Sequence, residues 1–482
     1  MVIAAPSEAQ PRRLPALAVG RSHPAIVALG ISFVVVLAVG LIQGPRPFYA
    51  DAQGYWELAS SFTDTGHFSL LNYGDPLRGY SLPLAIYVLK LFTNGTFESE
   101  SDAATLFNIV LFSLIGAVLT PRLAEIAWPQ RRWGLLPRLA LTVLLLVFWS
   151  GDLSYPLTDF PGLTMALVAL VAISRSDRLG WMLLAGIAAG LAINLRPAYL
   201  PLIPMLFVIV ALNWLDQRGS DHASSLRRAL CVSLLIAGLV LASLPQSLSE
   251  HRYFGTWDPI PGSRSAPGST QTLTEEVLTK GMSAQRWDSF ERPAGVANAI
   301  AYPDPAGKRL LEQQPEQKIK TWTQYFGLIV SHPTIMIPML VRRLVNGLDT
   351  RYSTIYVEHS PDGGLIWLRV GGWALVFLAL VRLLWPAARR RLGHARWRYP
   401  LALTFCCLSP IASAIEARYM LPVVLLSYVL TLAPGWPNPI GPAEAGWRRF
   451  RVVGLLALAA LVFGVVLWHM LSAVHSYTVY PA

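Results

Sequence analysis

Charged residues are scarce in this sequence of 482 residues. Asp, Glu, Lys and Arg together make up 14% of it, whereas 54% of the residues are hydrophobic. A soluble domain carries roughly a quarter charged residues. The deficit runs along the whole length, which excludes a soluble globular fold and makes lipid the expected solvent for most of the chain. The 16 tryptophans and 17 tyrosines suit the aromatic belts found at membrane interfaces.

Cysteine is also scarce. Cys231, Cys406 and Cys407 all lie in apolar runs, and their spacing indicates neither a disulfide framework nor a metal site. No other cluster of His, Asp and Glu supplies the ligands of a metal ion. We therefore expect chemistry that uses no metal and no other cofactor.

Motifs that read nucleic acids are absent, although the net charge is +11. The positive charge comes mainly from arginines in short connections between apolar runs, which is typical of cytoplasmic loops in membrane proteins. It forms no basic face. We expect the lipid bilayer as a partner and no nucleic acid.

The sequence contains many long apolar runs. A membrane span needs about 20 apolar residues, and this rule predicts about eleven transmembrane helices. The first is too long for a signal-peptide core and is interpreted as a retained anchor. The expected spans are 24–43, 103–121, 135–151, 158–174, 180–195, 198–215, 228–247, 364–384, 399–415, 418–434 and 450–471.

Every second connection between these spans is rich in arginine. Cytoplasmic loops carry this excess, so the N-terminus is expected inside and the C-terminus outside, in the plasma (inner) membrane. The arginines that set this orientation are Arg12, Arg13, Arg21, Arg122, Arg131, Arg132, Arg138, Arg175, Arg178, Arg218, Arg227, Arg228, Arg389, Arg390, Arg391, Arg396, Arg448, Arg449 and Arg451.

The predicted fold is all-α, with three parts. Residues 1–248 form a transmembrane module whose first outer loop, 44–102, carries short juxtamembrane helices. Residues 249–363 form a long extracytoplasmic loop, and residues 364–482 the C-terminal transmembrane helices. The run 325–341 contains His332, Pro333 and Pro338, which disfavour a span. We interpret this run as an amphipathic helix on the membrane surface.

Asp51 stands just beyond the first predicted span, in the stretch PRPFYADAQGY (45–55). The aromatic residues around it suit a groove at the lipid interface. The structural alternative is that Asp51 caps the N-terminus of a short helix, since Asp is a preferred cap. An acidic residue at this place can also meet a substrate at the outer membrane surface.

Other charged residues fall on the same predicted side. Charges near apolar helix ends either extend to the lipid headgroups or have a task. A carboxylate can take a proton from an attacking hydroxyl, and arginines suit the oxygens of a departing phosphate. Asp51 is the candidate base, and Arg78, Arg196 and Arg418 are the candidate phosphate ligands. Asp75, Asp152, Asp159 and Glu416 accompany them.

The order of these motifs resembles the GT-C glycosyltransferases, near the protein O-mannosyltransferases and the lipid A aminoarabinose transferases. Two positions depart from that pattern, since Ala52 follows Asp51 and Gly79 follows Arg78 where many members have glutamate and proline. The resemblance implies that Tyr55, Tyr80, Asp159 and Tyr419 contact substrate. It is carried by DAQGYWELA (51–59), PLRGYSLPLAIYVL (76–89), LTDFPGLTMAL (157–167), NLRPAYLPLIP (194–204) and EARYMLPVVLL (416–426).

The sequence thus predicts an enzyme that moves a sugar from a polyprenyl-phosphate donor to a carbohydrate, lipid or protein hydroxyl of the cell envelope, at the outer face of the membrane. A secondary transporter or lipid flippase is an alternative, although transporters place charges near the midplane and show inverted repeats, and we find no repeat. A ligase or polymerase of oligosaccharides is a further alternative, which the early position of Asp51 disfavours.

Overall fold

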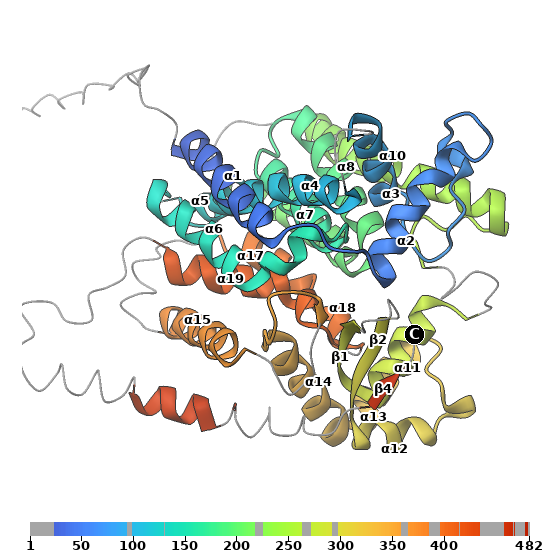
Figure 1. The fold of residues 1–482 in the computed structure, drawn as a ribbon, viewed down its shortest axis with the longest axis vertical. Helices are drawn as coiled ribbons and strands as arrows, with labels where there is room; N and C mark the ends of the chain where they lie inside the picture. Colours follow the sequence, from blue (N-terminus) through green and yellow to red (C-terminus); the bar gives the residue numbers. More distant parts are fainter. Residues whose placement is uncertain are drawn as a thin grey trace, which may run out of the picture.

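The computed structural model describes residues 24–93, 99–129, 131–216, 225–262, 271–291, 297–357, 365–384, 396–413, 415–433, 457–465, 467 and 478–480. Within this part the fold is mainly helical and belongs to a polytopic membrane protein. Figure 1 shows the N-terminal membrane helices gathered in one half of the molecule, and a small sheet with its flanking helices in the other half.

Among the residues that the structure describes, six helical stretches are long and apolar enough to cross a membrane, or seven if a bent pair of helices at 322–348 counts as one. Three of them are single helices: α1 (Pro24–Gln43), α10 (Ser225–Phe254) and α15 (Ile366–Leu384). Two combine a helix with a short turn: α6 (Leu135–Trp149) with Ser150–Ser154, and α9 (Leu202–Asp216) with Pro197–Tyr199. One consists of α4 (Glu100–Leu114), a π-helical turn (Ile115–Leu119) and α5 (Thr120–Ala127).

The predicted number of eleven spans is not confirmed. Three of the expected spans are apolar helices shorter than a full crossing: α7 (Asp159–Ile173), α8 (Leu179–Leu195) and α19 (Leu421–Leu432) with the turn Ala417–Met420. The expected span 399–415 is divided into α17 (Arg398–Phe405) and α18 (Leu408–Ile411). The last one, 450–471, lies mostly outside the described residues.

Helices α8 and α10 pack closely because glycines face each other across their interface. A Cβ atom on Gly186 would overlap the carbonyl oxygen of Leu235, and one on Gly238 would overlap that of Leu183. Small residues at such positions let two membrane helices approach until their backbones touch. This contact fixes the end of α8, from which Arg196 extends.

The segment 44–102, predicted to be the first outer loop, folds as expected into short helices. They are α2 (Ala50–Leu58), the 3₁₀ turns Ala59–Thr63 and Leu70–Asn72, and α3 (Ser81–Thr93). The Gly79 backbone lies directly against Asn194 near the end of α8, where a Cβ atom would overlap the Asn194 carbonyl oxygen. The Asn194 side chain also accepts a hydrogen bond from the backbone N–H of Ser81 at 2.9 Å. The loop is thereby attached to the membrane helices beside Arg196.

The fold is mainly helical, as predicted, but it also contains a small four-stranded sheet that the sequence did not indicate; three strands lie between α10 and α15 and the fourth lies beyond α15. Its order is β3-β1-β2-β4, with β1 antiparallel to β2, β3 parallel to β1 and β4 antiparallel to β2. A strand is identified in a sequence by the alternation of apolar and polar residues. On β1 this alternation is absent, because polar residues are buried there, namely Gln285, Arg286 and Asp288. The strands are β1 (Ala284–Glu291), β2 (Ala297–Pro303), β3 (Tyr356–Val357) and β4 (Thr478–Tyr480).

Helices surround this sheet: α11 (Leu273–Ser283), α12 (Pro305–Glu312), α13 (Trp322–Ser331) and α14 (Pro333–Leu348), with a 3₁₀ turn at Pro315–Gln317. The prediction of one continuous helix over 325–341 is wrong, because α13 and α14 meet at His332 with a bend of 115°. Pro333 lacks an N–H group and begins a new helix there. Whether this pair lies on the membrane stays a prediction.

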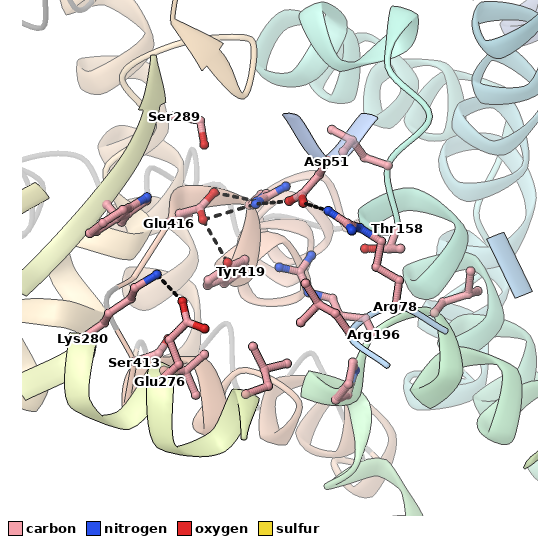
Figure 2. Close-up of a pocket in the computed structure, with 18 of the residues that line it drawn as sticks. Asp51, Arg78, Thr158, Arg196, Glu276, Lys280, Ser289, Ser413, Glu416 and Tyr419 are labelled. Carbon is pink, nitrogen blue, oxygen red and sulfur yellow. Dashed lines mark hydrogen bonds and ion pairs between the residues drawn. The ribbon is translucent and has the colours of Figure 1, made fainter. Parts of the chain in front are cut away.

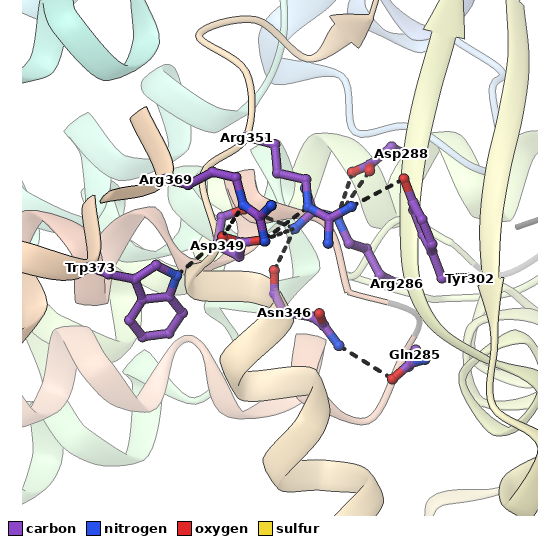
Figure 3. A network of polar contacts seen from close by, with 9 residues as sticks. All are labelled: Gln285, Arg286, Asp288, Tyr302, Asn346, Asp349, Arg351, Arg369 and Trp373. Carbon is purple, nitrogen blue, oxygen red and sulfur yellow. Dashed lines mark hydrogen bonds and ion pairs between the residues drawn. The ribbon is translucent and has the colours of Figure 1, made fainter. Parts of the chain in front are cut away.

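A buried polar network joins the sheet to the C-terminal membrane helix α15 (Figure 3). The carboxylate of Asp349 accepts hydrogen bonds from Arg351 at 2.8 Å and from Arg369 and Trp373 at 3.1 Å each. Arg286 on β1 donates to the backbone carbonyl of Asp349 at 2.8 Å. The end of α14, strand β1 and α15 are therefore held in one arrangement.

Candidate active site

A cavity of about 400 Å³ lies between the two halves of the molecule. One side of it is built by the first outer loop, the ends of α7 and α8 and the turn before α19, and the other side by α11 and β1 (Figure 2). Its lining consists of Asp51, Tyr55, Leu77, Arg78, Leu157, Thr158, Leu195, Arg196, Pro197, Leu273, Glu276, Val277, Lys280, Trp287, Ser289, Ser413, Glu416, Arg418 and Tyr419.

Asp51 occupies the first turn of α2, where the helix dipole favours a negative charge. It does not cap the helix, because the N-cap residue is Tyr49. The hydroxyl of Tyr356 on β3 holds this helix start: it donates to the Tyr49 carbonyl at 3.0 Å and accepts from the Ala52 N–H at 3.3 Å. Ala50 adopts a φ of 41°, in the region that residues with a Cβ atom disfavour. This sharp turn lets Asp51 face the cavity with 47% of its side chain exposed.

Arg78 contacts Asp51 directly. Its Nη2 donates to the Asp51 carboxylate at 2.8 Å. Asp75 organises the turn before it by accepting the backbone N–H groups of Leu77 at 2.9 Å and Arg78 at 2.6 Å. Gly54, three residues after Asp51, leaves the space that the guanidinium group fills, since a Cβ atom there would come within 3.2 Å of it.

Arg196 and Arg418 converge on the carboxylate of Asp159. Arg196 forms a close ion pair with it, and Nη1 of Arg418 lies 3.5 Å from it. The Tyr419 ring packs against both guanidinium groups, at 4.3 Å from Arg196 and 5.4 Å from Arg418. Two arginines from distant parts of the sequence are thus fixed side by side.

Arg418 is the centre of the charged cluster. Besides Asp159, it pairs with Glu416 at 2.6 Å, and its Nη2 lies 3.9 Å from the carboxylate of Asp51. Glu416 also accepts the hydroxyl of Tyr419 at 2.9 Å. Arg418 therefore connects the candidate base to the buried acids behind it.

Two of the residues expected to contact substrate do not line the cavity. Tyr80 is buried, and its hydroxyl donates to the Ala242 carbonyl at 2.8 Å, so it anchors the outer loop on α10. Asp159 is only 2% exposed and lies behind the arginines that it pairs with. Substrate contact by Tyr80 and Asp159 stays a prediction, and in this structure both lie outside the cavity lining. Tyr55 and Tyr419 do line the cavity.

The charges around Asp51 keep it ionised. Burial by itself raises the pKa of Asp51, but Arg418 and Arg78 outweigh this effect and hold that pKa below its ordinary value. The pKa of Arg78 is affected in the same way. Burial lowers it, but the Asp51 carboxylate raises it, and the net effect is that the pKa of Arg78 lies above its ordinary value. Burial and the nearby Asp51 raise the pKa of Tyr55 to about 12, so its hydroxyl stays protonated at neutral pH.

The sequence interpretation missed the wall formed by α11 and β1, which contributes Glu276, Lys280, Trp287 and Ser289. One signal for α11 was available. The stretch TLTE (272–275) is a capping box pattern, and the hydroxyl of Thr272 accepts the N–H of Glu275 at 3.1 Å. That pattern predicts a helix start, but nothing in it indicates that the helix faces Asp51.

A metal site is not evident in the part of the chain that the structure describes, where no group of three or more His, Cys, Asp or Glu could hold an ion. Of the acids that line the cavity, Asp51 pairs with Arg78, Glu416 with Arg418 and Glu276 with Lys280.

No family model and no curated protein matches this sequence. Among solved structures, the chain is similar to an archaeal oligosaccharyltransferase, AglB from Archaeoglobus fulgidus, in complex with an inhibitory peptide and a dolichol-phosphate. The match has a TM-score of 0.43 and 14% identity, and it covers 94% of this chain and 56% of that enzyme. At this similarity the activity of the archaeal enzyme says nothing about this chain. The resemblance to the GT-C glycosyltransferases stays an interpretation of the sequence.

Proposed function

We propose that this protein is a membrane glycosyltransferase that moves a sugar from a polyprenyl-phosphate donor to a hydroxyl of a cell-envelope acceptor. The observation that carries the proposal is one carboxylate, Asp51, exposed in a cavity whose wall presents three arginines. Asp51 is the base, and Arg78, Arg196 and Arg418 bind the donor phosphate.

The chemical step is a displacement at the anomeric carbon. The acceptor oxygen attacks that carbon while its proton passes to Asp51, and the bond from the carbon to the phosphate oxygen breaks. The products are the glycosylated acceptor, with inverted configuration, and polyprenyl phosphate. Negative charge grows on the departing phosphate, so the arginines stabilise the transition state more than the bound donor.

Donor binding would also change the basicity of Asp51. In the described residues, the three arginines of the site already pair with four carboxylates, those of Asp51, Asp75, Asp159 and Glu416. A phosphate that enters the cavity must therefore compete with these carboxylates for the arginines. A phosphate that takes over N–H groups of Arg78 weakens its pairing with Asp51. The pKa of Asp51 then rises, because the opposite charge that lowered it is partly neutralised. The carboxylate becomes a stronger base only when the donor is in place.

The position of the cavity supports transfer at a membrane surface. Its polar residues lie at the ends of the apolar helices α7, α8 and α19 and outside the long spans, whereas a transporter places its binding site near the midplane. We assign this surface to the outer face of the plasma membrane, from the arginine-rich connections on the opposite side. The three expected parts, 1–248, 249–363 and 364–482, would then be a catalytic membrane module, a cavity-closing segment and a C-terminal helical part.

The test is Asp51→Asn in purified protein supplied with a radiolabelled polyprenyl-phosphate sugar and a membrane extract as acceptor. We expect a loss of transfer of roughly 10²- to 10⁴-fold, the usual contribution of a general base. Asp64→Asn, an exposed change in the same loop, is the control and should retain activity. Full activity of Asp51→Asn would remove the base, and uptake of donor into vesicles without a covalent product would indicate transport.

A further inference from the structure

We propose that the α11–β1 wall, made of Glu276, Lys280 and Trp287, is a subsite for a sugar ring of the acceptor. This inference rests on the proposed function and specifies its acceptor as a carbohydrate. Figure 2 shows Glu276 and Lys280 across the cavity from Arg78 and Arg196, with Asp51 facing the same space.

The three residues form one compact surface. Lys280 pairs with Glu276 one helical turn before it, and its ammonium lies 5.1 Å from the centre of the Trp287 ring. All three line the cavity, and the side chains of Glu276 and Lys280 remain 27% and 47% exposed. A carboxylate, an ammonium and an indole are thus available together on one wall.

This wall is fixed relative to the arginines. The backbone N–H of Trp287 donates to the carbonyl of Ile415 at 2.9 Å, next to Glu416 and three residues before Arg418. On α11, Gly281 lies so close to Ala412 that a Cβ atom would overlap its carbonyl oxygen. Both walls are therefore attached to the same stretch of chain, and the distance between them is set by the backbone.

The chemistry of the wall suits a sugar better than the other acceptor classes. Sugar hydroxyls can donate to the Glu276 carboxylate and accept from Lys280, while the apolar C–H face of a pyranose packs on the indole. An exposed ion pair disfavours a purely apolar lipid acceptor. A peptide would add to a sheet edge, but β1 lies inside the sheet, between β3 and β2.

The geometry of the reaction assigns this wall to the acceptor. In an inverting displacement the attacking oxygen and the leaving phosphate stand on opposite sides of the anomeric carbon. The phosphate belongs to the arginines, and Asp51 faces the cavity beside them, so the attacking sugar reaches Asp51 across the cavity from the α11–β1 wall. A volume of about 400 Å³ is near the lower end of ligand pockets, roughly 300–1,000 Å³. It has room for the donor head and one acceptor residue.

The experiment compares Trp287→Ala, Trp287→Phe and Trp257→Ala in the full-length protein. Trp257 is 61% exposed and lies outside the cavity lining, which makes it the matched control. Transfer is measured with a labelled polyprenyl-phosphate sugar and a panel of methyl glycopyranosides as acceptors. We expect Trp287→Ala to raise the acceptor KM at least tenfold and the donor KM less than threefold, and Trp287→Phe to restore most of the acceptor affinity.

A second measurement separates this inference from the proposed function. The same glycosides are titrated by calorimetry into Asp51→Asn protein, with and without Trp287→Ala. Sugar binding that depends on Trp287 supports the subsite even if no variant transfers sugar. The subsite is overturned if Trp287→Ala raises the donor KM instead, if neither KM changes, or if no glycoside binds.

Discussion

Gly54 controls the position of Arg78 through the side chain that it lacks. It follows Asp51 by one helical turn, and the guanidinium group of Arg78 occupies the space beside its Cα atom, 3.2 Å from where a Cβ atom would stand. In the interior of α2 a glycine lowers helix stability by about 1 kcal/mol relative to alanine. A residue that weakens its helix while making room for a charged partner of Asp51 points to a role in the site.

Gly54→Leu should therefore separate activity from stability. The leucine side chain would displace the Arg78 guanidinium and remove a charge-assisted hydrogen bond, worth about 1.5–3 kcal/mol. We expect kcat/KM for the donor to fall roughly 10- to 100-fold, with no decrease in the thermal unfolding temperature. Gly327→Leu in α13, where a Cβ atom meets nothing within 4 Å, should change neither quantity. Unchanged donor kinetics in Gly54→Leu would mean that Arg78 has no part in donor binding.

At the residue scale, the sequence is most informative about charges next to apolar runs. Asp51, Arg78, Arg196 and Arg418 stand out because an ionised group near a membrane helix needs a partner, and all four line one cavity. The direction of a side chain is harder to predict. Tyr80 is next to the Arg78 loop in sequence, yet its ring is buried and bonded to α10.

At the scale of secondary-structure elements, Asp349 determines how β1 is held. Its carboxylate is 0% exposed and lies among Arg351, Arg369 and Arg286. Burial by itself raises the pKa of Asp349, but Arg351 and Arg286 outweigh it and lower that pKa. Since the folded-state pKa is lowered, the carboxylate stabilises the fold above its ordinary value of about 4 and loses this contribution as the pH falls below it.

Asp349→Asn should destabilise the protein. The change removes the only carboxylate that the described contacts place against both Arg351 and Arg369, and breaking a buried ion pair from one side costs about 3–5 kcal/mol. We expect a lower thermal unfolding temperature in detergent at pH 7 and a smaller loss of stability between pH 5 and pH 3 than in the unchanged protein. Glu316→Gln, which removes an exposed pair with Lys320, is the control. A wild-type unfolding temperature for Asp349→Asn would show that this network contributes no stability.

This network also explains why the sheet could not be predicted. A pattern of polar and apolar residues identifies a strand when its polar face meets water. On β1 the polar residues Arg286 and Asp288 are buried and pair with each other, and Arg286 also donates to the carbonyls of Asn346 and Asp349, 60 and 63 residues further along the chain. The capping pattern at Thr272 was visible, whereas the long-range pairs that turn α11 and β1 toward the cavity leave no mark in the local sequence.

At the scale of the whole molecule, the arrangement relative to the membrane follows from the arginine-rich connections. The turn between α7 and α8 is expected in the cytoplasm, and α12, beside the sheet, is expected outside. Arg178 and Glu312 are exposed at these two places. The native cysteines are buried, so a single engineered thiol can report each side.

We expect a membrane-impermeant maleimide to label Glu312→Cys in intact cells and Arg178→Cys only after the membrane is opened. Both variants are made in a chain whose three native cysteines are replaced by serine. The unsubstituted serine background is the control for non-specific labelling. Labelling of Arg178→Cys in intact cells, or of both thiols from the same side, would contradict the orientation.

Strand β4 has a consequence for how the protein is made. It pairs with β2, although α13, α14 and the C-terminal membrane helices separate the two strands along the chain. During synthesis β2 therefore emerges with an open edge, ready to pair with any passing strand. Residues 478–480 can cover that edge only after α13, α14 and α15 have been made. A nascent chain stalled before this point carries an unprotected strand next to β1, and we expect quality-control proteases to attack it.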